Sequence, residues 1–249
     1  HALGVKNVIE LNCEANGKFA HTPEPIPQNL TQISDLMKEG KADVGFVVDP
    51  DVDRLAIVME NGDMFVEEYT LVAVADYILA HTPGATVSNL SSSRALGDVT
   101  RARGCSYQAS AVGEVNVVAK MKETGAVIGG EGNGGVIYPE AHYGRDALVG
   151  VALFLTLLAK SGKKVSELKK TYPPYEIAKN KVELTPEIDV DAILNKMKEI
   201  YADEKITDID GVKIDFEDSW VHLRKSNTEP IIRIYAEAST MEDAERLGE

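Results

Sequence analysis

A cluster of acidic residues follows an apolar segment and has the composition of a cation site. Asp49, Asp51 and Asp53 recur at every second residue, and Arg54 closes the run. Carboxylates this close together repel one another unless a cation lies among them. Oxygen ligands suit Mg²⁺ or Ca²⁺, so this acidic triad predicts a metal loop at the end of a buried strand. The alternative is a solvated turn in which Asp is favoured by its turn geometry.

The triad also matches part of an EF-hand calcium loop. Together with Glu60, its members fall at positions one, three, five and twelve of such a loop. Position six is Arg54, where an EF-hand requires Gly, and residues 55–59 have the pattern of a strand. A calcium-binding structural module is therefore an alternative that the flanking sequence disfavours.

A glycine-rich loop follows a predicted strand further along the chain. Five of the seven residues at 129–135 are glycines, which let the backbone bend sharply and approach a ligand. The other two residues, Glu131 and Asn133, can accept and donate hydrogen bonds, which suits sugar hydroxyls better than phosphate. A turn without a ligand is the alternative, because a glycine-rich loop alone is weak evidence.

A third loop has the composition of an anion site. Arg224, Ser226, Asn227 and Thr228 lie between two predicted strands, and Arg233 follows. Arginine binds phosphate in a bidentate geometry, and the hydroxyls and backbone N–H groups of a turn add donors. An ordinary turn, in which these side chains bond their own backbone, leaves two arginines in an acidic chain unexplained.

Composition narrows the class of protein. The chain has 249 residues, a net charge of −14 and 44% apolar residues. This negative charge argues against nucleic acid or an anionic membrane as a partner. No apolar run approaches the about 20 residues of a membrane-spanning helix. Cys13 and Cys105 lie far apart and have the character of reduced thiols, which predicts a cytoplasmic protein.

Strand and helix patterns predict an α/β protein of three regions, at 1–63, 64–172 and 173–249. The first region carries predicted strands and a helix, at 5–11, 30–38, 44–48 and 55–59. In the second region, short strands alternate with helices, which predicts a parallel sheet whose ligand loops lie at the carboxyl ends of the strands. The third region, rich in strands, predicts a smaller α+β domain.

In order and residue types, the three loops resemble those of the α-D-phosphohexomutase superfamily, which includes phosphomannomutase/phosphoglucomutase and phosphoglucosamine mutase. That family has a metal loop Asp-x-Asp-x-Asp-Arg, a sugar loop Gly-Glu-x-Ser-Gly and a phosphate loop Arg-x-Ser-Gly/Asn-Thr-Glu-Pro followed by Arg. All three match here, although Asn133 stands where many members have Ser. The resemblance spans essentially all 249 residues and implies mixed-sheet α/β domains followed by a smaller C-terminal domain.

The resemblance also implies an activity. It implies a Mg²⁺-dependent isomerase that interconverts hexose 1-phosphate and hexose 6-phosphate through a hexose bisphosphate, with Arg54 as a catalytic residue. Glu131 and Asn133 are expected to hold sugar hydroxyls, and the third loop is expected to hold phosphate. Arg145 is expected to line the same cleft and to bind the anionic substrate. The family's Thr-x-Ser-His-Asn-Pro-like serine loop has no counterpart here, so the chain resembles a fragment without the phosphoserine domain and is expected to be inactive alone. A phosphoglucosamine mutase and a non-catalytic phosphosugar-binding fragment remain alternatives.

Overall fold

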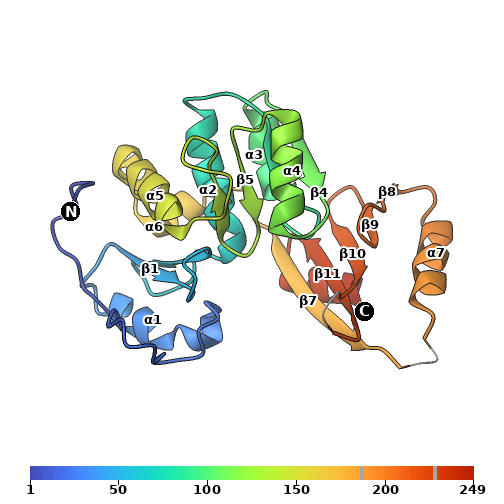
Figure 1. The fold of residues 1–249 in the computed structure, drawn as a ribbon, viewed down its shortest axis with the longest axis horizontal. Coiled ribbons are helices and arrows are strands. Elements are labelled where there is room, and N and C mark those ends of the chain that lie inside the picture. The colour runs from blue at the N-terminus through green and yellow to red at the C-terminus, as the bar shows by residue number, and fades with distance from the viewer. Residues whose placement is uncertain (186–187, 227–228) are drawn as a thin grey trace.

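The computed structural model describes residues 1–185, 188–226 and 229–249. Three sheets follow one another along the long axis of the molecule, with helices packed against them (Figure 1). The chain is an α/β protein with several sheets, as predicted. In the part of the chain that the structure describes, no helix is long and apolar enough to cross a membrane.

The first sheet is a two-stranded antiparallel hairpin. β1 (Val44–Val48) pairs with β2 (Leu55–Met59), and both strands have the predicted bounds. Every residue of β2 is buried, because the strand packs against α1 (Thr31–Lys38) and against two helices of the next region. The acidic triad occupies the connection between the two strands, so the buried strand β2 fixes one end of the candidate metal loop.

The prediction of a strand over residues 5–11 is wrong. These residues have no regular structure and are mostly exposed. A strand needs a neighbour that takes up its N–H and C=O groups, and β1 pairs only with β2 in the described chain. An apolar run alone could not reveal that this neighbour is absent.

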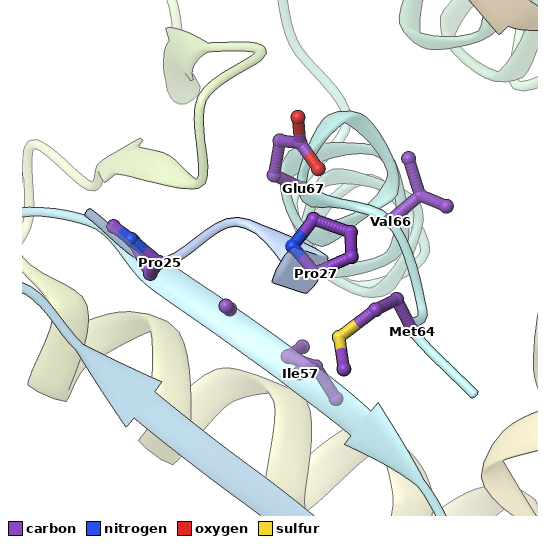
Figure 2. Close-up of a pocket in the computed structure, with 7 residues that line it drawn as sticks. Pro25, Pro27, Ile57, Met64, Val66 and Glu67 are labelled. Carbon is purple, nitrogen blue, oxygen red and sulfur yellow. The ribbon is translucent and has the colours of Figure 1, made fainter. Parts of the chain in front are cut away.

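A proline-rich segment lies over β2. Figure 2 shows Pro25 and Pro27 above the strand, with Met64 and Val66 beside them. The crevice that these residues line has a volume of about 10 Å³, which is room for about one water molecule. This crevice is therefore too small for a substrate, and the candidate site lies elsewhere.

The middle sheet places three loops at one edge. Its strands, in the order β4-β3-β5-β6, are β3 (Thr86–Asn89), β4 (Tyr107–Ser110), β5 (Ile128–Glu131) and β6 (Gly135–Ile137). The first three strands of this order are parallel and β6 is antiparallel, so the sheet is mixed. Since parallel strands end at the same edge, Asn89, Ser110 and Glu131 all lie there.

Helices cover this sheet and share one core with the first sheet. They are α2 (Glu67–Leu79), α3 (Ala95–Ala102), α4 (Glu114–Thr124), α5 (Ala147–Ser161) and α6 (Val165–Lys169). Phe154 of α5 packs edge-on against Phe46 and Phe65, with ring centroids 6.1 and 5.2 Å apart. Leu55 and Ile57 of β2 belong to the same core. The acidic triad and the glycine-rich loop are thus built on a common apolar base.

The C-terminal sheet is antiparallel, with the order β7-β11-β10-β9-β8. Its elements are β7 (Glu176–Glu183), α7 (Val190–Ile200), β8 (Lys205–Thr207), β9 (Val212–Asp215), β10 (Trp220–Lys225), β11 (Ile231–Ala238) and α8 (Met241–Gly248). Val212, Ile214 and Leu223 pack with Leu194 and Met197 of α7. This packing occupies the apolar face of the sheet.

The other face of that sheet is polar and contacts the middle region by hydrogen bonds. His222 Nδ1 lies 3.0 Å from Ser91 Oγ, and the N–H of Arg94 donates to Glu237 Oε1 at 3.0 Å. Lys179 Nζ lies 3.1 Å from Glu67 Oε1. The middle and C-terminal regions are therefore joined by specific polar contacts.

Candidate active site

The loop between β1 and β2 gathers the triad into one place. One carboxylate oxygen from each of Asp49, Asp51 and Asp53 lies within 4.8 Å of the other two. Opposite ligands of Mg²⁺ lie about 4 Å apart, so the three oxygens are close to the spacing that one ion requires. Asp53 Oδ1 is buried and has no hydrogen-bond partner among the described residues. The oxygen donors and this open atom fit a hard divalent cation.

Hydrogen bonds hold this loop in its conformation, which includes a strained backbone position. Asp49 Oδ1 accepts the N–H groups of Asp53 and Arg54 at 3.1 and 3.0 Å, and its Oδ2 accepts from Arg54 Nε at 2.7 Å. Val52 has φ of 60°, a left-handed conformation that costs a β-branched residue about 1–3 kcal/mol. Its carbonyl accepts the N–H of Ala147 at 3.1 Å, so the start of α5 supports the strained turn.

Two of the carboxyl groups have shifted pKa values in opposite directions. Burial raises the pKa of Asp53, Asp49 and Asp51 raise it further, and Arg145 opposes them. Burial also acts to raise the pKa of Asp49, but the hydrogen bonds from Arg54 outweigh it and the pKa is lowered. Asp53 is thus the member of the triad whose ionisation is disfavoured by burial beside other carboxylates, whereas Arg54 favours the ionised form of Asp49.

Glu131 stands at the carboxyl edge of the middle sheet and is buried. Its Oε1 accepts from Asn89 Nδ2 at 2.7 Å and from the N–H of Gly113 at 3.1 Å. Its Oε2 accepts from Arg145 Nη1 at 2.6 Å. A carboxylate has about four lone-pair directions, so these three bonds leave one direction, at Oε2, for a hydroxyl donor.

The rest of the glycine-rich loop contacts the metal loop directly. The carbonyl of Gly134, whose φ is 90°, accepts the N–H of Leu55 at 3.1 Å. Asn133 Oδ1 accepts the N–H of Gly135 at 3.1 Å, which shapes the turn. The N–H of Gly132 donates to the hydroxyl of Ser92 at 2.9 Å. This loop is therefore a fixed turn that lies beside the triad.

Arg145 joins the two loops. Its Nη2 contacts Asp53 Oδ2, while its Nη1 bonds Glu131 Oε2. Its Nε lies 3.8 Å from Glu114 Oε2, and its backbone N–H donates to Glu114 Oε1 at 2.8 Å. The side chain has a relative exposure of 18%, so its charge is largely taken up by carboxylates of the protein itself.

The candidate phosphate loop joins β10 to β11. Arg224 lies directly opposite Arg233, and Lys181 is the next residue in the same register row. Like charges directly opposite each other destabilise a sheet unless an opposite charge lies nearby. Arg233 Nη2 lies 2.8 Å from Glu229 Oε2, and Arg224 Nε lies 3.9 Å from an oxygen of Asp210.

Ser226 is the residue of the predicted Ser-Asn-Thr set that lies within the described structure. The N–H of Ser226 donates to the carbonyl of Ile231 at 2.9 Å, and the residue is buried. Asn227 and Thr228 lie outside the described residues.

Asp210 connects this loop to the middle sheet. Its Oδ2 accepts the N–H of Val112 at 2.9 Å, next to the Gly113 that bonds Glu131. Its carbonyl accepts from His222 Nε2 at 2.7 Å. A path of contacts thus runs from Arg224 through Asp210 to the sugar loop.

Sequence reasoning missed several of these residues, namely Asn89, Ser91, Ser92, Asp210 and His222. The rule that ligand loops follow the carboxyl ends of parallel strands points to Asn89 and the two serines, which end or follow β3. Asp210 and His222 belong to the C-terminal sheet and its approach, and local sequence does not show that they face the middle region.

The EF-hand alternative is wrong. The triad is flanked by β1 and β2, not by helices. The carboxylate of Glu60 accepts the N–H and the hydroxyl of Ser166, so it is occupied away from the triad.

Comparison with known proteins identifies the family. Models described as phosphoglucomutase/phosphomannomutase alpha/beta/alpha domain II, alpha/beta/alpha domain III and C-terminal domain match residues 1–62, 67–175 and 177–249. The chain belongs to this family. A "Phosphoglucomutase/phosphomannomutase" of Thermococcus kodakarensis is 39% identical over 97% of the chain and 53% of its own length. A "Probable phosphoglucosamine mutase" of Methanopyrus kandleri is 35% identical over 96% of the chain and 54% of its own length.

Solved structures of the family agree with this assignment. A crystal structure of a phosphoglucomutase/phosphomannomutase family protein from Burkholderia thailandensis superposes with a TM-score of 0.78. It is 28% identical and covers 91% of the chain and 49% of that protein. The chain therefore spans about half the length of the family members it matches. The relatives are named as mutases, which are isomerases.

Proposed function

We propose that the chain supplies the metal, sugar and phosphate sites of a phosphohexomutase on three successive domains, 1–63, 64–172 and 173–249. The reaction is the interconversion of hexose 1-phosphate and hexose 6-phosphate through a hexose bisphosphate. One observation supports the proposal most directly: Arg145 contacts both Asp53, a member of the acidic triad, and Glu131, a candidate hydroxyl acceptor. A phosphosugar needs both, because its phosphoryl charge must be offset and its hydroxyls must be held.

The residues of the metal loop have distinct roles in this proposal. Asp49, Asp51 and Asp53 hold Mg²⁺, which when bound supplies positive charge that offsets the charge of the transferring phosphoryl group. Arg54 is the catalytic residue. It is fixed by Asp49 at 2.7 Å and lies 3.6 Å from Asp53, so its remaining donors are available to phosphoryl oxygens.

The other two loops hold the substrate. Glu131 and Asn133 bind sugar hydroxyls, with the open acceptor on Glu131 Oε2 as the fixed point. Arg224, Ser226, Asn227, Thr228 and Arg233 bind the phosphate that is not reacting. The facing arginines on β10 and β11 support this role, because two guanidinium groups side by side offer planar sets of donors that match a phosphate.

The reaction also needs a phosphorylated serine. We propose that this serine lies in polypeptide outside these 249 residues, since no Thr-x-Ser-His-Asn-Pro-like loop occurs within them. The chain by itself is then expected to bind Mg²⁺ and glucose 1,6-bisphosphate in calorimetry, without converting glucose 1-phosphate. Conversion by this chain would contradict the serine assignment, and an absence of both binding events would contradict the proposed function.

Phosphoglucosamine mutase is the second candidate function, and the name of the relative from Methanopyrus kandleri favours it. The discriminating assay uses the enzyme completed with its N-terminal portion, supplied with Mg²⁺. Glucose, mannose and glucosamine 1-phosphates are compared by their kcat/KM values. A preference for the amino sugar would replace the glucose and mannose assignment with this one.

A further inference from the structure

Arg145 directs its charge toward carboxylates of the protein itself, whereas a substrate-binding arginine directs its charge toward a ligand. Its two terminal nitrogens face two different carboxylates of the protein, Asp53 Oδ2 at one and Glu131 Oε2 at the other. These partners belong to two different loops, and Arg145 stands in a third segment, next to the residue that caps α5. The guanidinium therefore forms a bridge between the metal loop and the sugar loop.

The bridge decides which atoms each loop leaves open. Arg145 takes Oδ2 of Asp53, so the buried Oδ1, which lies 3.6 Å from Arg54 Nε but has no hydrogen bond from the described chain, is the oxygen that can face a cation. On Glu131, Asn89 and Gly113 occupy Oε1, and the remaining acceptor direction lies on Oε2 beside Arg145. The planar guanidinium holds its donors in a rigid fork, so it fixes the spacing between these two open acceptors.

The surroundings hold the bridge in place. Glu114 accepts the backbone N–H of Arg145 at 2.8 Å and lies 3.8 Å from its Nε. A Cβ on Gly135 would overlap the stem of the Arg145 side chain, so the glycine provides the space in which the stem lies. Because the stem and head are both confined, the guanidinium is placed so that a displacement of Asp53 would be passed to Glu131.

We propose that Arg145 is a positioning residue that couples cation binding at the triad to hydroxyl binding at Glu131. This inference rests on the proposed function, in which the triad binds Mg²⁺. Two sites that bias one shared element change each other's affinity by the same factor, typically about 5-fold or more. The coupling is a property of the bridge, so a positive charge at position 145 is not sufficient for it.

The rival explanation is electrostatics through space, in which Glu131 attracts Mg²⁺ without any bridge. Arg145→Lys separates the two explanations. A lysine keeps the positive charge but has a single ammonium in place of the planar fork, so it cannot hold both carboxylates in the same geometry. Glu131→Gln serves as the perturbation, because Glu131 lies outside the triad.

The test is a double-mutant cycle on Mg²⁺ affinity, measured by isothermal titration calorimetry on the 249-residue chain. We expect Glu131→Gln to change the Kd for Mg²⁺ about 5-fold or more with Arg145 present, and less than about 2-fold in the Arg145→Lys background. The matched control is Arg103→Lys, which alters an ion pair with Asp76. In that background, Glu131→Gln is expected to keep its full effect.

The outcomes are separable. An equal effect of Glu131→Gln in both backgrounds, or no effect at all, overturns the bridge while leaving the metal site intact. Absence of Mg²⁺ binding to the unmodified chain overturns the proposed function instead. Should Arg145→Lys fail to fold, hydrogen exchange on the unmodified chain decides: Mg²⁺ must slow exchange at the amide of Gly113, which bonds Glu131, and unchanged exchange there overturns the coupling.

Discussion

His222 offers a quantitative test of how the C-terminal sheet is joined to the middle region. Its ring lies between Ser91 Oγ, 3.0 Å from Nδ1, and the carbonyl of Asp210, 2.7 Å from Nε2. A carbonyl only accepts, so Nε2 carries the proton and Nδ1 accepts from Ser91. Burial lowers the pKa of His222 from 6.5 to about 4; Lys213 and Arg224 contribute to this decrease, and the contacts with Asp210 oppose it.

This lowered pKa makes the free energy of unfolding depend on pH, and it sets the sign and the size of that dependence. Between pH 4 and 6.5 the folded chain binds fewer protons at His222 than the unfolded chain does. The contribution of the neutral His222 ring to the free energy of unfolding is therefore fully present above pH 6.5 and is lost as the pH falls toward 4. At about 1.4 kcal/mol per pH unit, the loss amounts to about 3 kcal/mol.

The assay is urea unfolding of the unmodified chain and of His222→Gln, from about pH 7.5 to about pH 4. The difference between their free energies of unfolding is expected to shrink by about 3 kcal/mol over this range, since subtraction removes the other titrating groups. His81→Gln, at an exposed position, is the control. A difference that stays constant within about 0.5 kcal/mol would refute the reasoning.

Three further predictions follow from other sites. Burial raises the pKa of Glu68 to about 8, with Lys179 opposing, so its stabilising contribution is full below 4.5 and is lost as the pH rises through 8. Glu68→Gln is therefore expected to flatten the dependence of the melting temperature on pH over that interval. Mg²⁺ at 100 times its Kd is expected to raise the free energy of unfolding by about 2.7 kcal/mol in scanning calorimetry; EDTA and Asp51→Asn are each expected to abolish the gain, and a gain that survives Asp51→Asn contradicts the triad. Arg224→Ala and Arg233→Ala are each expected to weaken calorimetric binding of glucose 1,6-bisphosphate about 10–100-fold, because a charge-assisted hydrogen bond contributes about 1.5–3 kcal/mol. Unchanged affinity in both variants contradicts the phosphate loop.

The local sequence was sufficient to predict the two strands around the triad and the positions of the three loops in the chain. The apolar runs of β1 and β2 have clear ends, and the spacing of Asp49, Asp51 and Asp53 within one loop guarantees that they lie close together. By contrast, β6 and β8 have only three residues each, which is too short for a periodic pattern.

Partners far apart in the sequence could not be predicted in the same way. Arg145 and Asp53 are separated by 92 positions, and an arginine near a phosphate site is as readily taken for a ligand of the substrate. The structure instead gives Arg145 two carboxylates of its own chain. Which oxygen of Asp53 or Glu131 the protein itself occupies depends on tertiary packing, and no local motif records it.

The glycine at position 132 is required by a neighbouring side chain and not by its backbone conformation. Its φ lies outside the left-handed region, so the backbone there would accept other residues. Space forbids them, because a Cβ at Gly132 would overlap the carboxylate of Glu68. That carboxylate is itself held by the N–H of Ser93 at 3.0 Å and lies 3.6 Å from Lys179 Nζ. A side chain at position 132 of this chain therefore requires either a smaller residue at position 68 or a movement of the Glu68 carboxyl group away from Ser93 and Lys179.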